Sequence, residues 1–322
     1  MKKYMKGLWL EEGKLTFRDD LPVPEPPHGE ALIKILLAGI CSTDLELVKG
    51  YYPYQGVLGH EFVGMVVSAP DEPSWVGKRI VGEINAFCGV CSECKAGRTT
   101  HCINRTVLGI IRRDGAFAEY CTLPIENLHI VPPNVPNDAA VFTEPLAAVL
   151  EIQQQVNIRP ADRVVLIGSG RLGLLVAYSI VLIGCDLKVV VRRERPKKLL
   201  AEKGIHTISV DDVMPRMADI VIDTSGSAGG LLLAKKALRP RGTLVLKSTY
   251  QGNTTINLSE FVVDEITLVG SRCGPFPPAL NLLNQSLIDT RNLIDGRYPL
   301  KDGSIAFEKA AIPGTLKILL EP

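Results

Sequence analysis

The chain has 322 residues, of which 46% are hydrophobic and 22% charged. This composition is ordinary for a globular protein, and the length leaves room for two domains. The formal net charge of +1 at pH 7 gives no reason to expect nucleic acid or an anionic membrane surface as a partner. The N-terminus lacks the apolar segment of a signal peptide, and the longest apolar run, Leu172–Gly184, is too short to span a bilayer. We therefore expect a cytoplasmic protein that binds neither nucleic acid nor membranes.

The first 150 residues form a strand-rich, irregular region, with no long helical pattern before Asn137. Apolar runs at residues 31–37 and 62–67 predict strands. Four prolines between residues 22 and 27 indicate an extended loop. This part of the chain also carries most of the residues that could bind a metal.

Four of the eight cysteines fall within fifteen residues: Cys88, Cys91, Cys94 and Cys102. In a reducing cytosol, cysteines so close together are more often metal ligands than disulfide partners. Four thiolates complete the tetrahedral coordination of one zinc ion, which is typical of a closed, structural site. A zinc ribbon that contacts nucleic acid fits the balanced charge poorly, and the spacing alone leaves an iron–sulfur cluster open.

A second set of possible ligands is dispersed. Cys41 follows an apolar strand, and His60 stands nineteen residues later, directly before Glu61. Another carboxylate, Glu144, comes much later in the chain. A buried cysteine or a hydrogen-bonded histidine is the ordinary interpretation of each residue taken singly. Together they offer one sulfur, one nitrogen and two carboxylates, which suffice for a zinc site with an open position.

From Arg163 onward the chain alternates between apolar strands and helices. The expected strands span residues 164–167, 187–191, 220–223, 243–247 and 267–269. This alternation predicts a doubly wound α/β domain with a parallel sheet. The pattern ends at Arg272, and the last fifty residues, with a helix near 277–289 and a strand at 315–320, are too few for a separate domain. We therefore expect one domain from residues 1–150 and 272–322, and a second from residues 151–271.

The first of these strands leads into a glycine-rich turn and a helix. The turn reads Gly168-Ser169-Gly170-Arg171-Leu172-Gly173, which fits the pattern G-x-G-x-x-G. Its glycines allow a tight turn, close approach of a pyrophosphate, and close contact between helix and strand. The N–H groups at the helix N-terminus favour the phosphates. Alone the pattern is weak, but the order strand, turn and helix predicts a dinucleotide site.

The end of the second strand indicates which dinucleotide binds. An acidic residue that binds the ribose of NAD is expected there, some twenty residues past the fingerprint. Here the chain instead places Arg192 and Arg193 (192 − 168 = 24). Arginines at this place would hydrogen-bond a 2′-phosphate and predict NADP. A solvated basic helix start is the alternative interpretation, and Glu194 would serve NAD if the register shifted by two.

Taken together, these motifs resemble those of the zinc-containing medium-chain dehydrogenase/reductase family, the alcohol and polyol dehydrogenases. The similar segments run in family order along nearly the whole chain: Cys41–Asp44, Gly59–Gly64, the four-cysteine segment, Asp114–Tyr120, Glu144–Ala147 and Gly168–Gly173. The resemblance implies a GroES-like, mostly β catalytic domain built from both chain ends, with a Rossmann domain inserted. It also implies two zinc ions per chain and a homodimer or homotetramer.

The resemblance assigns roles to the dispersed residues. Cys41 and His60 would ligate a catalytic zinc, with Asp44 orienting the ring of His60. Glu144 stands where many members use a second cysteine and would be the third ligand, as in the sorbitol and threonine dehydrogenase branches. Glu61 would be an alternative or exchanging ligand.

The implied reaction is hydride transfer between an alcohol carbon and nicotinamide C4, with Thr43 hydrogen-bonded to the oxygen of a small alcohol or carbonyl substrate. Glu46 stands where many members carry a histidine of the proton relay, and the segment 69–76 is short, so the proton route and the substrate stay open. The alternatives are an NAD-dependent polyol dehydrogenase, a zinc-free quinone reductase and a non-enzymatic nucleotide-binding relative.

Overall fold

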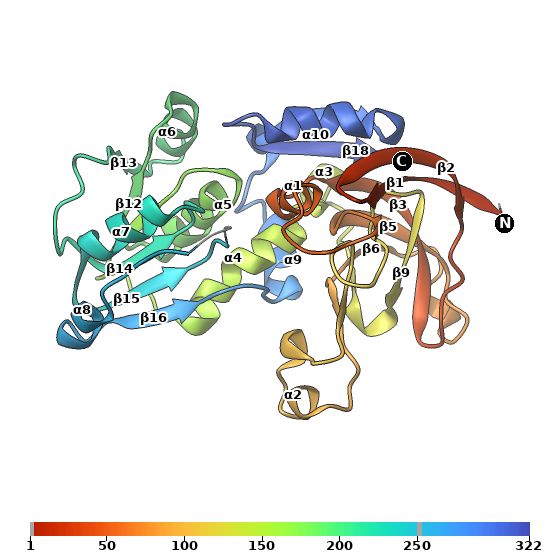
Figure 1. Cartoon of the computed structure of the whole chain (residues 1–322), viewed down its shortest axis with the longest axis horizontal. Coiled ribbons are helices and arrows are strands. Elements are labelled where there is room, and N and C mark those ends of the chain that lie inside the picture. Colours follow the sequence, from red (N-terminus) through yellow and green to blue (C-terminus); the bar gives the residue numbers. More distant parts are fainter. Residues whose placement is uncertain (1–2, 250–252) are drawn as a thin grey trace. The chain divides into compact units, whose positions relative to one another are not determined.

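The computed structural model describes residues 3–249 and 253–322. It divides into two compact units (Figure 1): unit 1 comprises Met1–Glu144 and Phe276–Pro322, and unit 2 comprises Pro145–Pro275. These bounds lie a few residues from the boundaries expected at 150 and 272. The described helices include none that is long and apolar enough to cross a membrane.

Unit 1 is built mainly from antiparallel strands. Its largest sheet has the order β10-β6-β5-β3-β18-β17, with β9 paired to β3. The strands of this sheet are β3 (Glu30–Gly39), β5 (Glu61–Ser68), β6 (Arg79–Gly82), β9 (Tyr120–Pro124), β10 (Leu128–Ile130), β17 (Ile294–Pro299) and β18 (Lys317–Glu321). A second sheet contains β1 (Tyr4–Glu11), β2 (Lys14–Pro22) and β4 (Gly56–Val57), and β7 (Asn85–Ala86) pairs with β8 (Thr106–Val107). The mostly β character expected of this region is confirmed.

The central strand of unit 1 is β3, which is almost entirely buried. It pairs with β5, β9 and the C-terminal strand β18, all antiparallel. Because β18 joins β3 directly, the last residues of the chain complete a sheet that begins near its start. The strands expected at 31–37 and 62–67 lie within β3 and β5, and the strand expected at 315–320 overlaps β18. These three strands are neighbours in one sheet.

The helices of unit 1 are short. They are α1 (Ser42–Val48), α2 (Ser92–Lys95), α3 (Asn137–Ala140), α9 (Phe276–Asn284) and α10 (Gly303–Ala311), with α4 (Thr143–Gln155) running on into unit 2. Among the described residues of this unit, 3₁₀ turns lie at Pro73–Trp75, Thr99–His101, Ile125–Asn127, Arg291–Leu293 and Leu300–Asp302. The expected helix at 277–289 is too long: α9 ends at Asn284, and Ser286 has a φ of 56°, a left-handed conformation that a helix cannot continue.

Unit 2 is a six-stranded parallel sheet with the order β13-β12-β11-β14-β15-β16. Its strands are β11 (Arg163–Ile167), β12 (Asp186–Val190), β13 (His206–Ile208), β14 (Ala218–Asp223), β15 (Leu238–Leu246) and β16 (Thr267–Gly270), and its helices are α5 (Arg171–Ile180), α6 (Glu194–Ala201), α7 (Ala228–Ala237), α8 (Leu258–Val263) and the 3₁₀ turn Val181–Ile183. The predicted doubly wound sheet is confirmed. The strand β13 was missed because only three residues form it, and none of them is fully buried.

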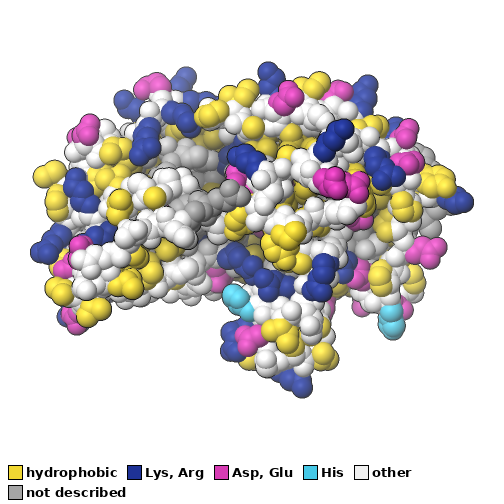
Figure 2. Space-filling model, viewed as in Figure 1, with side chains coloured by type: hydrophobic (Ala, Val, Ile, Leu, Met, Phe, Trp, Pro, Cys, Tyr) yellow, Lys and Arg dark blue, Asp and Glu magenta, His cyan; other side chains and the backbone are white. Residues whose placement is uncertain are grey.

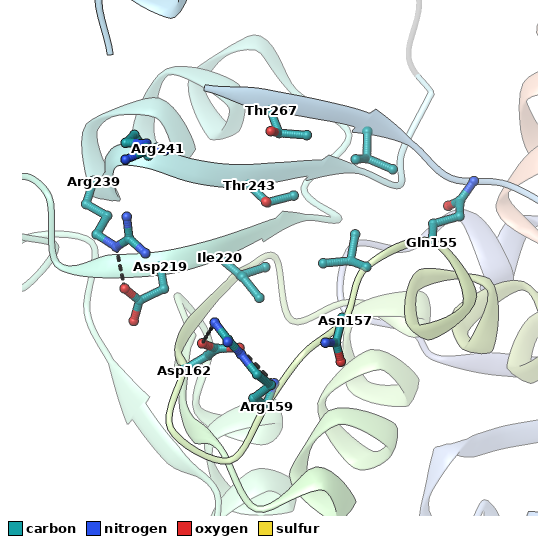
Figure 3. A pocket seen from close by; sticks show the side chains of 12 residues that line it. Gln155, Asn157, Arg159, Asp162, Asp219, Ile220, Arg239, Arg241, Thr243 and Thr267 are labelled. Atoms are coloured by element: carbon teal, nitrogen blue, oxygen red, sulfur yellow. Dashed lines mark hydrogen bonds and ion pairs between the residues drawn. The ribbon is translucent and has the colours of Figure 1, made fainter. Parts of the chain in front are cut away.

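A groove of about 270 Å³ lies at the amino edge of this sheet (Figure 3). The charged side chains that line it are paired: Arg239 with Asp219, Arg159 with Asp162, and Arg241 with Glu265. The nucleotide loop Gly168–Gly173 follows β11 at the opposite, carboxyl edge, where ligands of open α/β sheets bind. The groove is therefore separate from the predicted cofactor site.

Candidate active site and metal centres

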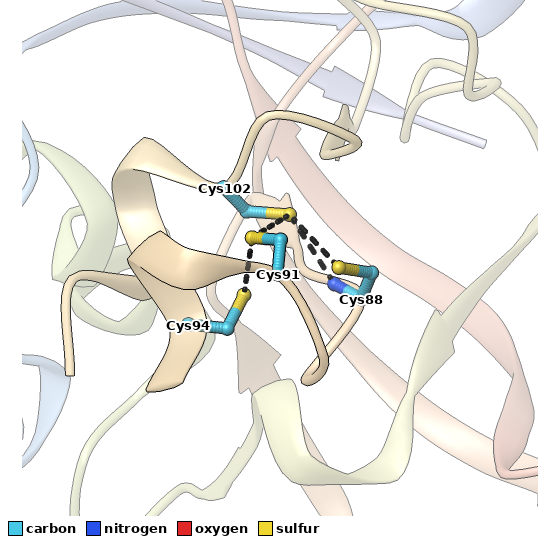
Figure 4. Close-up of side chains that lie close together, drawn as sticks. All are labelled: Cys88, Cys91, Cys94 and Cys102. Carbon is cyan, nitrogen blue, oxygen red and sulfur yellow. Dashed lines mark hydrogen bonds between the residues drawn. The ribbon is translucent and has the colours of Figure 1, made fainter. Parts of the chain in front are cut away.

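Four cysteines converge in a lobe of unit 1 that contains the short helix α2 (Figure 4). The Sγ atoms are 3.5 Å apart for Cys88–Cys102, 3.5 Å for Cys91–Cys94 and 3.8 Å for Cys91–Cys102. All four are free thiols, so these contacts are not disulfides. A tetrahedral zinc ion with Zn–S bonds of about 2.3 Å holds its sulfur ligands about 3.8 Å apart. The spacing therefore fits one tetrahedral ion, and it leaves no room for a multi-iron core between the sulfurs.

The backbone of this lobe favours the ionised form of the thiols. Hydrogen bonds from the backbone of Val90 and Cys91 lower the pKa of Cys88 to about 6. Backbone hydrogen bonds also lower the pKa of Cys91 below its usual value. Burial instead raises the pKa of Cys94 to about 12. Since the thiolate is the form that binds metal, Cys88 and Cys91 are the thiols that the backbone prepares for a cation.

The dispersed ligands also come together. Ligand atoms of Cys41, His60 and Glu61 all lie within 4.8 Å of one another. His60 and Glu61 are buried, and Cys41 is half-buried. One thiol, one imidazole and one carboxylate at this separation form a donor set suited to zinc.

Local structure explains how these donors are oriented. Cys41 precedes α1, and its backbone N–H donates to Asp44 Oδ2 at 2.8 Å. The other carboxylate oxygen, Oδ1, lies 3.2 Å from Nδ1 of His60, and Asp44 is completely buried. Nε2 of His60 is therefore left to face the cluster. As expected from the sequence, Asp44 lies where it would fix the orientation of this ring.

The same neighbours act on the ionisation of His60. Burial lowers the pKa of its ring, but the Asp44 carboxylate and the Cys41 sulfur raise it more, so that the pKa lies well above its ordinary value. The Asp44 carboxylate and the Cys41 sulfur thus favour a positive charge at the ring of His60. The Thr43 hydroxyl lies 3.8 Å from Cys41 Sγ, at the edge of the same cluster.

Two carboxylates are candidates for the third ligand position, and only one of them lies close to the other possible ligands. Glu61 belongs to the cluster, whereas Glu144, half-buried in the first turn of α4, is not among the described residues whose ligand atoms meet there. Glu61 is, however, also ion-paired with Lys317 of β18. Sequence reasoning missed Lys317, because a lysine in a terminal strand gives no sign that it is buried beside residues from the first quarter of the chain.

The glycine-rich loop of unit 2 has the conformation that its sequence predicts. Gly168 has a φ of 102° and starts the turn, and Gly170 caps the N-terminus of α5. A Cβ on Gly173 would lie 2.1 Å from the carbonyl oxygen of Gly168, so only glycine allows this helix to approach the strand so closely. The backbone N–H groups at the start of α5 are thereby held at the carboxyl edge of the sheet, as a pyrophosphate requires.

The two arginines expected to select the cofactor lie at the same edge. β12 runs parallel to β11 and ends at Val190, opposite Ile167. Arg192 and Arg193 come next after Val191 and are exposed, and Arg193 is the N-cap residue of α6. Within the part of the chain that the structure describes, neither guanidinium has an ion-pair partner.

Comparison with known proteins agrees with this geometry. Residues 27–133 match the family model of the alcohol dehydrogenase GroES-like domain. The sorbitol dehydrogenase of Halalkalibacterium halodurans is 29% identical over 94% of both chains, and the D-arabitol-phosphate dehydrogenase of Enterococcus avium is 27% identical over 100% of this chain and 98% of its own. A protein of Sinorhizobium meliloti described as a zinc-binding dehydrogenase, solved bound to NADP, superposes with a TM-score of 0.91 at 29% identity over all of both chains.

The chain belongs to the zinc-containing medium-chain dehydrogenase/reductase family. Its enzyme class is that of the zinc-dependent alcohol and polyol dehydrogenases, which transfer hydride between an alcohol carbon and a nicotinamide. The fold class, a GroES-like domain together with a Rossmann domain, is likewise confirmed.

Proposed function

We propose that this dehydrogenase oxidises a small alcohol, or reduces the corresponding aldehyde or ketone, with NADP and two zinc ions per chain. The observation that supports this best is the meeting of the half-buried Cys41 with the buried His60 and Glu61 in one cluster of possible metal ligands. Thr43 stands beside them. A purely structural protein has no use for such a cluster with a hydroxyl next to it.

The residues present fit the catalytic metal. Cys41 and His60 are two of its ligands, and the third is a carboxylate, Glu144 or Glu61. When bound, the zinc acts as a Lewis acid that stabilises an alkoxide or polarises a carbonyl. Thr43 orients the substrate oxygen and accepts or returns its proton, and Asp44 holds His60 in the productive orientation.

The cofactor proposal depends on the carboxyl edge of the sheet in unit 2. The loop Gly168–Gly173, with Ser169, Arg171 and Leu172 between its glycines, presents N–H groups to the pyrophosphate. Arg192 and Arg193 stand where the 2′-phosphate of NADP would lie, and no carboxylate occupies position 192 or 193. One charge-assisted hydrogen bond is worth about 1.5–3 kcal/mol, hence a preference of about 10- to 150-fold over NAD.

The four-cysteine site is proposed to hold the second zinc, with a structural role. Four thiolates fill the tetrahedral coordination of one ion, so that a metal there would have no open position. The eight free cysteines also fit a reducing compartment such as the cytoplasm.

Self-association into a homodimer or homotetramer is proposed from the edge of unit 2. β16 is the last strand of its sheet, and its outer edge is unpaired among the described strands. Leu258, Val262, Val263 and Leu268 on and beside it are 47% to 80% exposed, and apolar side chains gather over α8 and β16 (Figure 2). An exposed apolar edge strand invites pairing with a second copy, which light scattering of the purified protein would detect.

A second candidate function is that of a polyol dehydrogenase using NAD. The polyol dehydrogenases among the relatives favour it, and the same metal cluster would serve it. A panel of simple alcohols, polyols, polyol phosphates and their carbonyl partners, run with both cofactors while following absorbance of the reduced nicotinamide, separates the two. Turnover of none of them by a preparation with two zinc ions per chain would refute the proposal.

A further inference from the structure

A lysine lies buried at the carboxyl edge of the sheet in unit 2. Lys247 directly follows β15 and is only 8% exposed. Its backbone N–H donates to the carbonyl oxygen of Asp223 at 3.0 Å, so the residue continues the pairing of β15 with β14. Because β11, β14 and β15 are parallel, this is the edge at which the glycine-rich loop also lies. The positive charge of Lys247 is therefore placed at the edge predicted to bind the cofactor.

Two neutral oxygens and close packing hold the Lys247 side chain in place. Nζ donates to Oγ of Ser271 at 3.2 Å and to the carbonyl oxygen of Arg272. Both acceptors follow β16 at the same edge, and Ser271 is itself buried. A Cβ on Gly274 would lie 2.1 Å from the carbonyl oxygen of Ala147, so the segment after β16 packs tightly against α4. The ammonium is thus fixed between the ends of β15 and β16.

Two carboxylates from neighbouring elements bear on this charge differently. Burial raises the pKa of Glu151 in α4, and the positive charge of Lys247 acts against this rise, so these two groups interact. Asp223 faces α7 instead, because a Cβ on Gly230 would lie 3.2 Å from its Oδ1. The same oxygen accepts the backbone N–H of Ser225 at 2.8 Å. Glu151 therefore offsets part of the charge of Lys247.

The order of the strands indicates which part of the cofactor meets Lys247. A dinucleotide binds across the point where the strand order reverses, with one nucleotide on each half of the sheet. In the order β13-β12-β11-β14-β15-β16 that point lies between β11 and β14. The arginines proposed for the 2′-phosphate follow β12, which assigns the adenosine to that half. The nicotinamide is then expected over the ends of β14, β15 and β16, where Lys247 is buried.

We propose that Lys247 selects the reduced form of the cofactor. The nicotinamide ring carries a positive charge when it is oxidised and none when it is reduced, so a fixed ammonium beside it repels only the oxidised form. When both forms are present the chain is loaded with NADPH, which is the form that gives hydride to the carbon of an aldehyde or ketone. This inference rests on the proposed cofactor site, and it goes beyond it by assigning the preferred direction of the reaction.

The test is the ratio of the dissociation constants of NADP⁺ and NADPH, measured at pH 8 in the full-length, zinc-loaded protein without substrate. Fluorescence follows NADPH, and calorimetry follows NADP⁺. Lys247→Gln removes the charge but keeps an N–H donor, and the ratio is expected to fall about tenfold, mainly because NADP⁺ binds more tightly. Lys247→Arg, which keeps the charge, should retain the wild-type ratio. Lys236→Met, which changes an exposed lysine of α7, should leave both constants unchanged.

A second substitution makes an opposite prediction and serves also if Lys247→Gln does not fold. Glu151→Gln removes a charge that offsets the ammonium, so the ratio should rise. A loosened structure would instead weaken both forms of the cofactor alike and leave the ratio unchanged. An unchanged ratio in either variant, or shifts in the same direction, would overturn the inference, as would a wild type that binds NADP⁺ more tightly than NADPH. A wild type that binds no nicotinamide dinucleotide in either form would instead refute the proposed function.

Discussion

The contact between α5 and β11 allows a test that separates folding from cofactor binding within one loop. Gly173 and Gly170 belong to the same glycine-rich turn, but their surroundings differ. A Cβ on Gly173 would meet backbone, 2.1 Å from the oxygen and 2.8 Å from the carbon of the Gly168 carbonyl group, whereas a Cβ on Gly170 would meet nothing within 4 Å. Alanine at these two positions therefore has different predicted effects.

Gly173→Ala is expected to destabilise unit 2. Real Cβ atoms essentially never come closer than 3.0 Å to another heavy atom, so the new methyl group is 3.0 − 2.1 = 0.9 Å too close to a carbonyl that strand pairing holds in place. The start of α5 must move away by about this amount. Overpacking of this kind costs about 1–3 kcal/mol, which corresponds to a melting temperature lower by about 2–12 °C for a chain of this size.

Gly170→Ala is the matched variant. Its φ of −83° suits any residue, and the methyl group projects into open space, so the melting temperature of the cofactor-free protein should stay within about 1–2 °C of wild type. The methyl group would occupy the space through which the pyrophosphate approaches the backbone, so NADP should bind at least tenfold more weakly. Thermal unfolding without cofactor and titration with NADP measure the two effects. Wild-type stability of Gly173→Ala, or wild-type NADP affinity of Gly170→Ala, would show that the loop does not act as argued.

Four other predictions concern separate parts of the chain. Cys94→Ser should lower the zinc content from about two to about one per chain and lower the melting temperature, whereas Cys185→Ser, outside both clusters, should do neither; equal zinc contents would refute the structural site. Arg192→Asp should abolish or reverse the preference for NADP, measured as the ratio of kcat/KM for the two cofactors, and an unchanged ratio would mean that the 2′-phosphate lies elsewhere. Thr43→Ala should keep its zinc but lose about 10²- to 10⁴-fold in kcat, and zinc loss would instead indicate a structural role for this residue. Asp219→Asn should lower the free energy of unfolding by about 1–2 kcal/mol at pH 7, because the carboxylate is 17% exposed between two arginines that are themselves partly exposed. Hydrogen bonds from those arginines hold the pKa of Asp219 well below its usual value. The loss of stability should therefore be constant above about pH 4 and vanish in more acidic solution.

Much of the fold could be predicted because the patterns are local. The run Val164–Ile167 is apolar and β-branched, and both the turn and the helix after it have their own sequence signals. The four-cysteine lobe could be predicted for the same reason, because its ligands lie within fifteen residues and one short segment brings them together. In both cases neighbours in the sequence are also neighbours in space.

Errors arose where long-range packing decides the structure. The short strand β13 (His206–Ile208) exists because it pairs with β12, and three residues carry no periodicity from which to predict it. The helix α9 ends at Asn284, earlier than its apolar pattern suggests, because Ser286 adopts a left-handed conformation. Neither feature can be derived from the amino acids in its own segment.

The cluster around His60 shows the limit most clearly, and it also shows what decides the chemistry there. The sequence identified Cys41, His60 and Glu61 as possible ligands from their types and order, yet it favoured Glu144 as the third ligand over Glu61. The choice depends on which cation each carboxylate faces, and for Glu61 that cation is Lys317, 256 residues away in the sequence. The pairing of β18 with β3 brings Lys317 to Glu61 from the other end of the chain, so the surroundings of this possible ligand depend on that pairing as much as on the ligand residues themselves. A substitution that shifts β18 should therefore alter metal affinity without touching a ligand.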